Sequence, residues 1–331
     1  MSWLKLKLSS RYLAAGVGLV ALYLVLNLLF GSNEYFSHVM TLAAINVILA
    51  VSLNLINGFT GQFSLGHAGF MAVGAYMAGG LTFFLKVPFL LALAAGSLAA
   101  GIVGFLVGLP TLRLRGDYLA IATLGFGEII RVLIINSDSI GLPMLGGPRG
   151  VRGIPGYTSF GWAYLFAVIT VLVIANFINS THGRACISIR EDEVAAEAMG
   201  IDTTRYKVLA FSIGAAFAGL AGGLFAHQLQ LLHPDSYTFL KSVDHLTMVV
   251  LGGMGSITGA AVAGIFITVF SEALREVQDL RMIVYSLSLI VIMLVRPQGL
   301  MGGRELRLET FRRLLPNRRT AQTGGGARGT A

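Results

Sequence analysis

The sequence predicts an all-α fold, a polytopic helical membrane protein with about 8–10 transmembrane or re-entrant helices. Hydrophobic residues make up 55% and charged residues 12% of the 331-residue chain, whereas roughly 25% of the residues in a soluble domain are charged. The apolar residues gather in runs near the length, about 20 residues, at which a helix crosses a bilayer. The 42 glycines suit the close helix packing of membrane proteins. These proportions argue against a soluble α/β domain, because too few polar side chains remain to cover its surface.

Seven apolar runs are long enough to span a membrane, and a shorter eighth run has Arg281 and Arg296 at its ends, whose side chains can reach the interfaces. In chain order the runs cover residues 12–30, 38–56, 63–85, 88–110, 117–135, 161–179, 208–231 and 280–295. The first run follows basic residues, as in a signal peptide. It is longer than the usual apolar core of such a peptide and no small-residue cleavage site follows it, so we expect a retained span.

The distribution of Lys and Arg predicts the orientation. With the N-terminus inside, the cytoplasmic segments carry Lys5, Lys7, Arg11, Arg113, Arg115, Arg184, Arg190, Arg205 and Lys207. The segments outside carry only Lys86, Arg149, Arg152 and Lys241, as the positive-inside rule requires. We therefore expect both termini and residues 180–207 to be cytoplasmic.

Two parts of unequal size are predicted, a transmembrane domain over residues 1–303 and a basic cytoplasmic tail over residues 304–331. Arginines 296, 304, 307, 312, 313, 318, 319 and 328 follow the last apolar run. A basic tail suits nucleic acid or anionic lipid, and on a membrane protein we expect lipid and no nucleic acid. The glycine-rich end cannot bury apolar area, so part of the tail is expected to be disordered.

A glycine cluster divides the region 245–270. Gly252, Gly253 and Gly255 separate two apolar segments, 244–251 and 257–270. A single crossing here would leave the arginine-rich tail outside, so we predict a broken or re-entrant hairpin at membrane depth. Such backbone is tolerated only where protein or a water-filled cavity satisfies it. Two short ordinary spans are the alternative, and they keep the tail inside as well.

A second cluster of glycines and polar residues lies at the edge of the third run. Its members are Gly61, Gln62, Ser64, Gly66 and His67. Polar groups at a membrane edge usually face a cavity, so these residues are candidates for a translocation pathway. The residues themselves favour a packing role, in which the side chains bond to carbonyls of a broken helix. We assign no metal site, because no His, Cys or carboxylate spacing typical of one surrounds His67.

Four more polar residues lie within the predicted spans. Glu128 and Arg131 are three residues apart, on one face of a helix, and we expect them to form an intramembrane ion pair. The pair suits an anchor for another subunit, a relay of conformational change, or a structural contact. Asn46 and Asn54 are expected to bond across helices.

The polar segment 180–207 contains a predicted short helix. Ser188 or Asp192 is a candidate cap for a helix that starts near Glu191, and Gly200 is a natural stop. Alanines between them give one face of small side chains. Such a helix suits docking into a groove of a partner, and a solvated helix without a partner is the alternative.

Several blocks of the sequence, in order from about residue 40 to 303, resemble the LivH/LivM family of ABC importer permeases, and in particular its LivM type. The first blocks are Asn57-Gly58-x-x-Gly61-Gln62-x-Ser64-Leu65-Gly66-His67-Ala68-x-Phe70 and Gly74-Ala75-Tyr76. Arg190-Glu191-Asp192-Glu193-x-Ala195-Ala196-Glu197-Ala198-Met199-Gly200 is similar to the "EAA" loop of such permeases. The last are Leu251-Gly252-Gly253-Met254-Gly255-Ser256 and Arg296-Pro297-x-Gly299-Leu300.

The resemblance implies the fold of an ABC importer permease in a bacterial inner membrane, carrying branched-chain amino acids. It implies a LivH-like second permease subunit, two ATP-binding subunits of the LivG and LivF kind, and a periplasmic or lipid-anchored solute-binding protein. Residues 190–193 and 195–200 would couple the permease to the ATPase. A urea or short-chain amide permease shares these blocks and stays open as an alternative.

The chain itself has no phosphate-binding loop, because no glycine is followed by lysine. ATP and Mg are therefore expected on the partner subunits, with no cofactor on this chain. An ion-coupled secondary transporter would usually place more acidic residues than Glu128 in its spans. A membrane-embedded enzyme would need an acid–base or metal constellation, and none is readable.

Overall fold

The computed structural model describes residues 33–276, apart from 113, 115, 140 and 142–144, and residues 23–25, 27, 28, 286, 287, 290, 294, 295 and 299–301. The predicted runs 12–30 and 280–295 lie largely outside the described residues, and the basic tail 304–331 lies wholly outside them.

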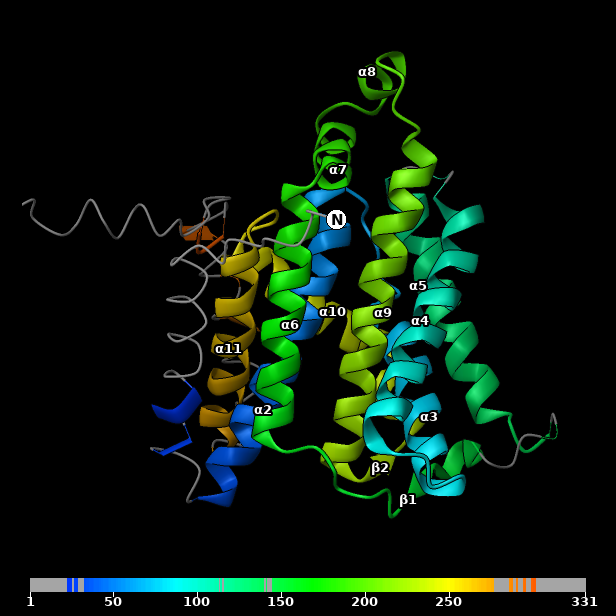
Figure 1. Ribbon diagram of the computed structural model, residues 1–331, viewed down its shortest axis with the longest axis vertical. Coiled ribbons are helices and arrows are strands. Elements are labelled where there is room, and N and C mark those ends of the chain that lie inside the picture. The colour runs from blue at the N-terminus through cyan, green and yellow to red at the C-terminus, as the bar shows by residue number, and fades with distance from the viewer. Residues whose placement is uncertain are drawn as a thin grey trace, which may run out of the picture.

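The described chain folds into a bundle of helices that run between two ends (Figure 1). The α-helices are α2 (Glu34–Asn54), α3 (His67–Phe84), α4 (Phe89–Thr111), α5 (Asp117–Ile135), α6 (Phe160–Asn179), α7 (Thr181–Glu191), α8 (Glu193–Ala198), α9 (Thr203–Leu229), α10 (Phe239–Gly252) and α11 (Ile257–Ala273). A π-helical turn, η1 (Leu55–Phe59), prolongs α2, and short 3₁₀ turns are η3 (Gly147–Arg149), η4 (Pro234–Tyr237) and η5 (Leu274–Glu276). Two-residue strands β1 (Val151–Arg152) and β2 (Leu231–Leu232) pair antiparallel. The all-α prediction is confirmed.

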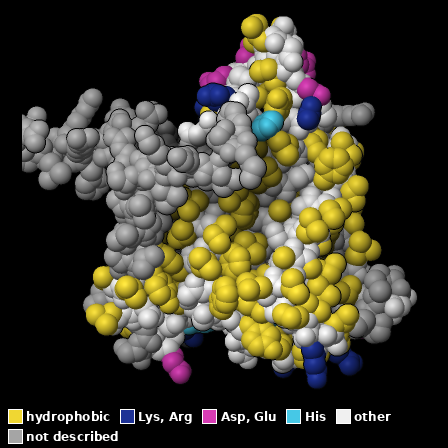
Figure 2. Space-filling model, viewed as in Figure 1, with side chains coloured by type: hydrophobic (Ala, Val, Ile, Leu, Met, Phe, Trp, Pro, Cys, Tyr) yellow, Lys and Arg dark blue, Asp and Glu magenta, His cyan; other side chains and the backbone are white. Residues whose placement is uncertain are grey.

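Five helices of the described chain are long and apolar enough to cross a membrane. They are α2 with η1, α4, α5, α6 and α9, and α11 is a shorter apolar helix. The predicted runs 88–110 and 161–179 match α4 and α6 within one residue, and the bounds predicted for α5 are the observed ones. Helix α2 begins four residues before the predicted run 38–56. Apolar side chains cover the middle of the bundle, while charged ones gather at its two ends (Figure 2).

Two predicted boundaries are wrong. Helix α9 begins at Thr203 and not at 208, because the carboxylate of Asp202 caps it by accepting the N–H of Arg205 at 3.0 Å. Residues 203–207 therefore belong to α9 and not to the loop predicted over 180–207. Helix α3 begins at His67 and not at 63, because residues 60–66 form a non-helical, mostly buried segment that enters the bundle.

The predicted interruption at the glycine cluster is confirmed. Gly253 and Gly255 have φ of 104° and 82°, which glycine adopts at no steric cost. Ser256 then caps α11 by accepting the N–H of Gly259 at 3.1 Å. The break lies beside η1 and α7, at one end of the bundle, so the predicted position of the hairpin at membrane depth is wrong.

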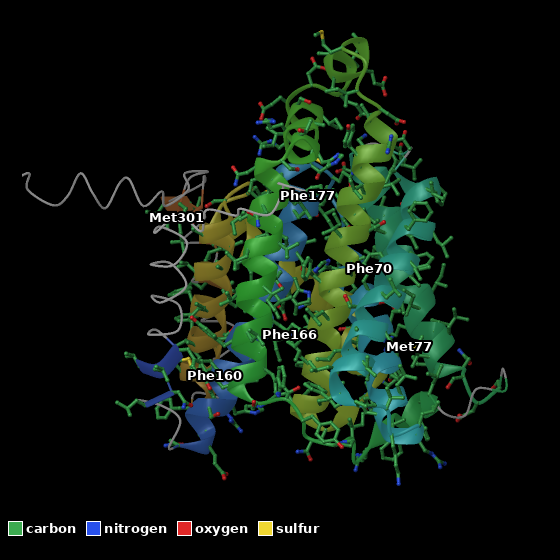
Figure 3. All side chains as sticks on the ribbon, viewed as in Figure 1. Phe70, Met77, Phe160, Phe166, Phe177 and Met301 are labelled. Carbon is green, nitrogen blue, oxygen red and sulfur yellow. The ribbon has the colours of Figure 1, made fainter. Side chains whose placement is uncertain are left out.

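Residues 299–301, part of the closing block of the sequence, contact this break. The N–H of Leu300 donates to the carbonyl of Leu251 at 2.7 Å, and the N–H of Met301 donates to that of Gly252 at 3.3 Å. The last carbonyls of α10 thereby gain the partners that a helix end lacks. Met301 lies toward the same end of the bundle as Phe177, near the end of α6 (Figure 3).

Small residues bring α3, α4 and α9 together at the centre. A Cβ on Gly74 of α3 would meet the backbone of Gly219 in α9, so these two helices touch backbone to backbone. Beside this contact, the buried rings of Phe70 and Phe211 lie edge to face, 5.4 Å apart. Figure 3 shows Phe70 inside the bundle. This packing fixes α3 and the segment before it.

The connections alternate between the two ends as the sequence predicts. Gly58 contacts Arg190 of α7 at one end, and β1 meets β2 at the opposite end. Figure 1 shows α7 and α8 at the top and the strands at the bottom. Residues 180–202 thus share an end with the turns after α2 and α10.

We expect Gly253→Val to destabilise the protein, because a β-branched residue at φ of 104° is strained by about 1–3 kcal/mol. The measurement is thermal unfolding of the purified protein in detergent. Gly80→Ala is the control, since a Cβ there meets nothing within 4 Å and alanine favours helix. Equal unfolding midpoints for Gly253→Val and the native protein would contradict the strain.

Candidate functional site

The segment that resembles the coupling loop forms two helices rather than one. Glu191 ends α7, and Asp192 caps α8 by accepting the N–H of Ala195 at 3.0 Å. Gly200, with φ of 84°, ends α8. The N–H of Gly200 donates to Glu197 and that of Ile201 donates to Ala196, the bond pair of a Schellman motif. The predicted Asp192 cap and Gly200 stop are confirmed, whereas Ser188 lies within α7.

Acidic residues of α8 hold it against α9. Glu193 pairs with Lys207 at 2.6 Å, and the Lys207 side chain is only 8% exposed. Glu197 accepts the hydroxyl of Thr203 at 2.8 Å. On the other side, Val194 and Met199 are 64% and 82% exposed. The protruding tip of the molecule (Figure 1) therefore exposes these two apolar side chains on a short helix, which its bonds to α9 hold in place.

Arg190 joins this segment to both glycine-rich interruptions. Its guanidinium donates to the carbonyl of Gly58 at 2.9 Å and pairs with Glu191. A Cβ on Gly61 would lie 2.9 Å from Cγ of Arg190, and one on Gly255 would lie 2.7 Å from its Nη1. The arginine side chain thus lies between two glycines that are far apart in the sequence.

Asn54, the last residue of α2, bonds to the break that follows α10. Its amide oxygen accepts the N–H of Gly255 at 2.9 Å, and its amide nitrogen donates to the carbonyl of Ser256 at 2.8 Å. The other predicted asparagine, Asn46, donates to the hydroxyl of Thr268 on α11 at 2.8 Å. Both expected bonds across helices are confirmed.

The polar segment before α3 is buried. Asn57 bonds to the backbone of Ser64 in both directions, at 3.3 Å each. A Cβ on Gly66 would meet the backbone of Thr123 in α5, so this glycine permits close approach. Neither amide atom of Gln62 nor the hydroxyl of Ser64 has a hydrogen-bond partner in the described part of the chain. Buried polar atoms of this kind usually bond to water or to a ligand.

A histidine that sequence reasoning missed lies beside His67. Nε2 of His67 is 3.0 Å from the hydroxyl of Ser52, and the His245 ring of α10 lies edge to face with it at 5.9 Å. Both nitrogens of His245 and Nδ1 of His67 are buried without a partner among the described residues. The sequence signal that could have identified His245 is its three-residue spacing from Ser242, which places both side chains on one face of α10. That face packs against α3, because Ser242 accepts the N–H of Ala68.

The structure places Glu128 and Arg131, the predicted charge pair, beside each other, and their group has a third member. Arg131 lies 3.4 Å from Glu128 and 2.8 Å from Asp235 of η4. Glu128 also accepts the N–H of Phe239, the first residue of α10, at 3.3 Å. The pair therefore holds the start of α10 against the middle of α5. Asp235 was missed because it follows a loop and carries no periodic signal.

The predicted pathway residues thus form two groups. The first group belongs to the segment from η1 to the start of α3 and consists of Gly61, Gln62, Ser64, Gly66 and His67. The second group forms the break at the end of α10 and consists of Gly252, Gly253 and Gly255. Arg190 brings Gly61 and Gly255 together. In the described residues, no three His, Cys, Asp or Glu side chains are placed to hold a metal ion.

A protein-family model, described as "Branched-chain amino acid transport system / permease component", matches residues 35–295. The chain belongs to this family of transport permeases. It is 38% identical to the LivM permease of the high-affinity branched-chain amino acid transport system of Escherichia coli K12, over 80% of this chain and 69% of that protein. The corresponding LivM of Salmonella typhimurium is 37% identical over the same shares.

The LivH permease of Escherichia coli K12 is 27% identical, over 81% of this chain and 94% of that protein. No solved structure matches the permease. Family membership makes it a multi-pass membrane protein and the transport component of an ABC system, and permeases of this kind are not enzymes themselves.

The thiol of Cys186 is expected to react slowly. The side chain is fully buried in α7, and burial raises the pKa of the thiol to about 11. Since only the thiolate reacts, both the raised pKa and the burial slow the reaction at neutral pH. Alkylation by a water-soluble maleimide at pH 7.5 should therefore be about tenfold or more slower than in an Arg184→Cys variant, whose thiol is exposed on the same helix. Comparable rates would contradict this burial.

Proposed function

We propose that the permease forms, with a LivH-like second permease subunit, the inner-membrane pathway through which branched-chain amino acids enter a bacterium. Two ATP-binding subunits of the LivG and LivF kind would hydrolyse ATP with Mg, and a periplasmic or lipid-anchored solute-binding protein would deliver the cargo. Family membership and the 37–38% identity to two LivM proteins support this assignment. A urea or short-chain amide permease is the less favoured alternative.

The ATP-binding subunits dock, in this proposal, on the tip formed by α8 and the end of α7. Residues Arg190–Glu193 and Ala195–Gly200 make up the coupling loop. The exposed side chains of Val194 and Met199 suit an apolar groove, since apolar anchors at the centre of a patch carry most of the energy of an interface. The Glu193–Lys207 pair would keep the tip rigid enough to pass on a displacement.

Arg190 carries the displacement to the pathway. The supporting observation is its bond to Gly58 and its position between Gly61 and Gly255. A movement of α7 would shift the segment before α3 and the break after α10 together. The buried, unpartnered groups of Gln62, Ser64 and His67 then belong to the pathway proposed for Gly61–His67 and Gly252–Gly255, because passing water or solute would supply their missing bonds.

Arg190→Gln should uncouple transport from ATP hydrolysis. A hydrogen bond to a charged group contributes about 1.5–3 kcal/mol, so we expect leucine uptake per ATP to fall by about tenfold or more. The assay uses proteoliposomes with the complete transporter and its binding protein. Arg184→Gln is the matched control, an exposed arginine of the same helix. Normal uptake per ATP in Arg190→Gln would refute the relay, whereas a native complex that moves no leucine would refute the function itself.

The orientation is proposed from the Lys and Arg distribution: both termini and residues 180–202 are cytoplasmic. Arg184→Cys lies at the α7 end and Arg152→Cys lies on β1 at the opposite end. In intact spheroplasts an impermeant maleimide should label only Arg152→Cys, and Arg184→Cys should react after permeabilisation. The reverse pattern would invert the topology.

A further inference from the structure

A cavity of about 500 Å³ lies between α2, α9, α10 and α11, a volume within the range of small-molecule sites, roughly 300–1,000 Å³. The cavity lies in the half of the bundle away from α7. Its walls include the C-terminal part of α11, and α11 begins at the break beside α7. Two cavities of about 750 and 550 Å³ elsewhere have mostly apolar walls. The polar side chains that line the cavity of about 500 Å³ are Asn46, Lys241, Asp244, Thr268, Ser271 and Glu272.

Charges of both signs stand side by side on the α10 wall. Nζ of Lys241 is 3.8 Å from Oδ2 of Asp244, and the two side chains are 31% and 46% exposed. The two groups form an ion pair, but the distance is too long for a hydrogen bond, so the ammonium donors and the carboxylate oxygens are not used up by each other. Charged groups within a membrane protein are costly and usually mark a substrate or ion path. A ligand with one negative and one positive group would therefore complement Lys241 and Asp244.

The opposite wall, from α2 and α11, is polar but already bonded. Asn46 donates to Thr268 at 2.8 Å. Glu272 accepts the hydroxyl of Tyr35 and a guanidinium N–H of Arg275, both at 2.9 Å. Within the described part of the chain, the carboxylate of this cavity that accepts no hydrogen bond is therefore that of Asp244. Between the two walls, apolar side chains from all four helices complete the cavity.

We propose that this cavity binds a branched-chain amino acid as a zwitterion during its passage through the permease. Lys241 binds the carboxylate, Asp244 binds the ammonium group, and the aliphatic side chain lies against Leu42, Phe225 and Met248. The inference rests on the proposed function and adds the contact residues. Binding here is weak by necessity, since a pathway must release what it binds.

The test is protection of an engineered thiol. Ser271→Cys is nearly isosteric and lies in the wall, and the buried Cys186 stays silent. The purified transporter, without its binding protein, is alkylated by a water-soluble maleimide. Saturating leucine should slow alkylation about tenfold by occupying the cavity. Leucinol, which lacks the carboxylate, and 4-methylpentanoate, which lacks the ammonium group, should not protect.

Charge variants assign the roles. Lys241→Met and Asp244→Asn, each combined with Ser271→Cys, should abolish protection by leucine, and Arg152→Met, which removes a cation at the same end of the bundle, should not. Phosphoethanolamine represents the headgroup of a zwitterionic lipid, and protection by it equal to that by leucine would overturn the assignment to substrate. Absence of protection by leucine, or equal protection by leucinol, would also overturn the proposal. If the same transporter still takes up leucine with its binding protein, the proposed function stands.

Discussion

The hydrogen bond from Arg190 to the carbonyl of Gly58 is the contact on which one end of the bundle depends. Three departures from regular helix meet there: the π-turn after α2, the buried segment before α3, and the break between α10 and α11. Gly61 and Gly255 lie so close to the arginine side chain that a Cβ would displace it. The small residues thus make room for a long, charged side chain, which satisfies an oxygen that the interrupted helix leaves unpaired.

Each interruption is stabilised by polar groups brought from elsewhere in the chain. The side chain of Asn54 forms hydrogen bonds with the turn at Gly255, and the backbone of Leu300 donates one to the end of α10. The side chain of Asn57 forms hydrogen bonds with the backbone of Ser64. Inside a membrane protein, non-helical backbone persists only where its hydrogen bonds are complete. The bonds therefore explain why the chain can break its helices here and keep one fold.

Helix α10 links the two ends of this arrangement. Its first N–H bonds to Glu128, and the turn after it is held by Asn54. Helix α10 faces His67 through His245. Asp244 next to it and Lys241 one turn before it line the cavity. In the proposed transport cycle, a shift of α7 would reach the break after α10 through Arg190 and alter the surroundings of these side chains. The same short helix would then connect ATP hydrolysis with the binding of cargo.

The sequence by itself determined the features that depend on neighbouring residues. Hydropathy runs placed the long helices, the Asp192 cap and Gly200 stop delimited α8, and a three-residue spacing predicted the Glu128–Arg131 pair. These signals are local, since helix periodicity and capping act over one or two turns. Only the tertiary structure decided that Arg190 meets Gly58 and Gly255, that Asp235 joins Arg131, and that His245 faces His67. These partners are 65 to 178 residues apart in the sequence. Capping and helix periodicity do not reach that far, so only the packing of the helices against one another brings these residues together.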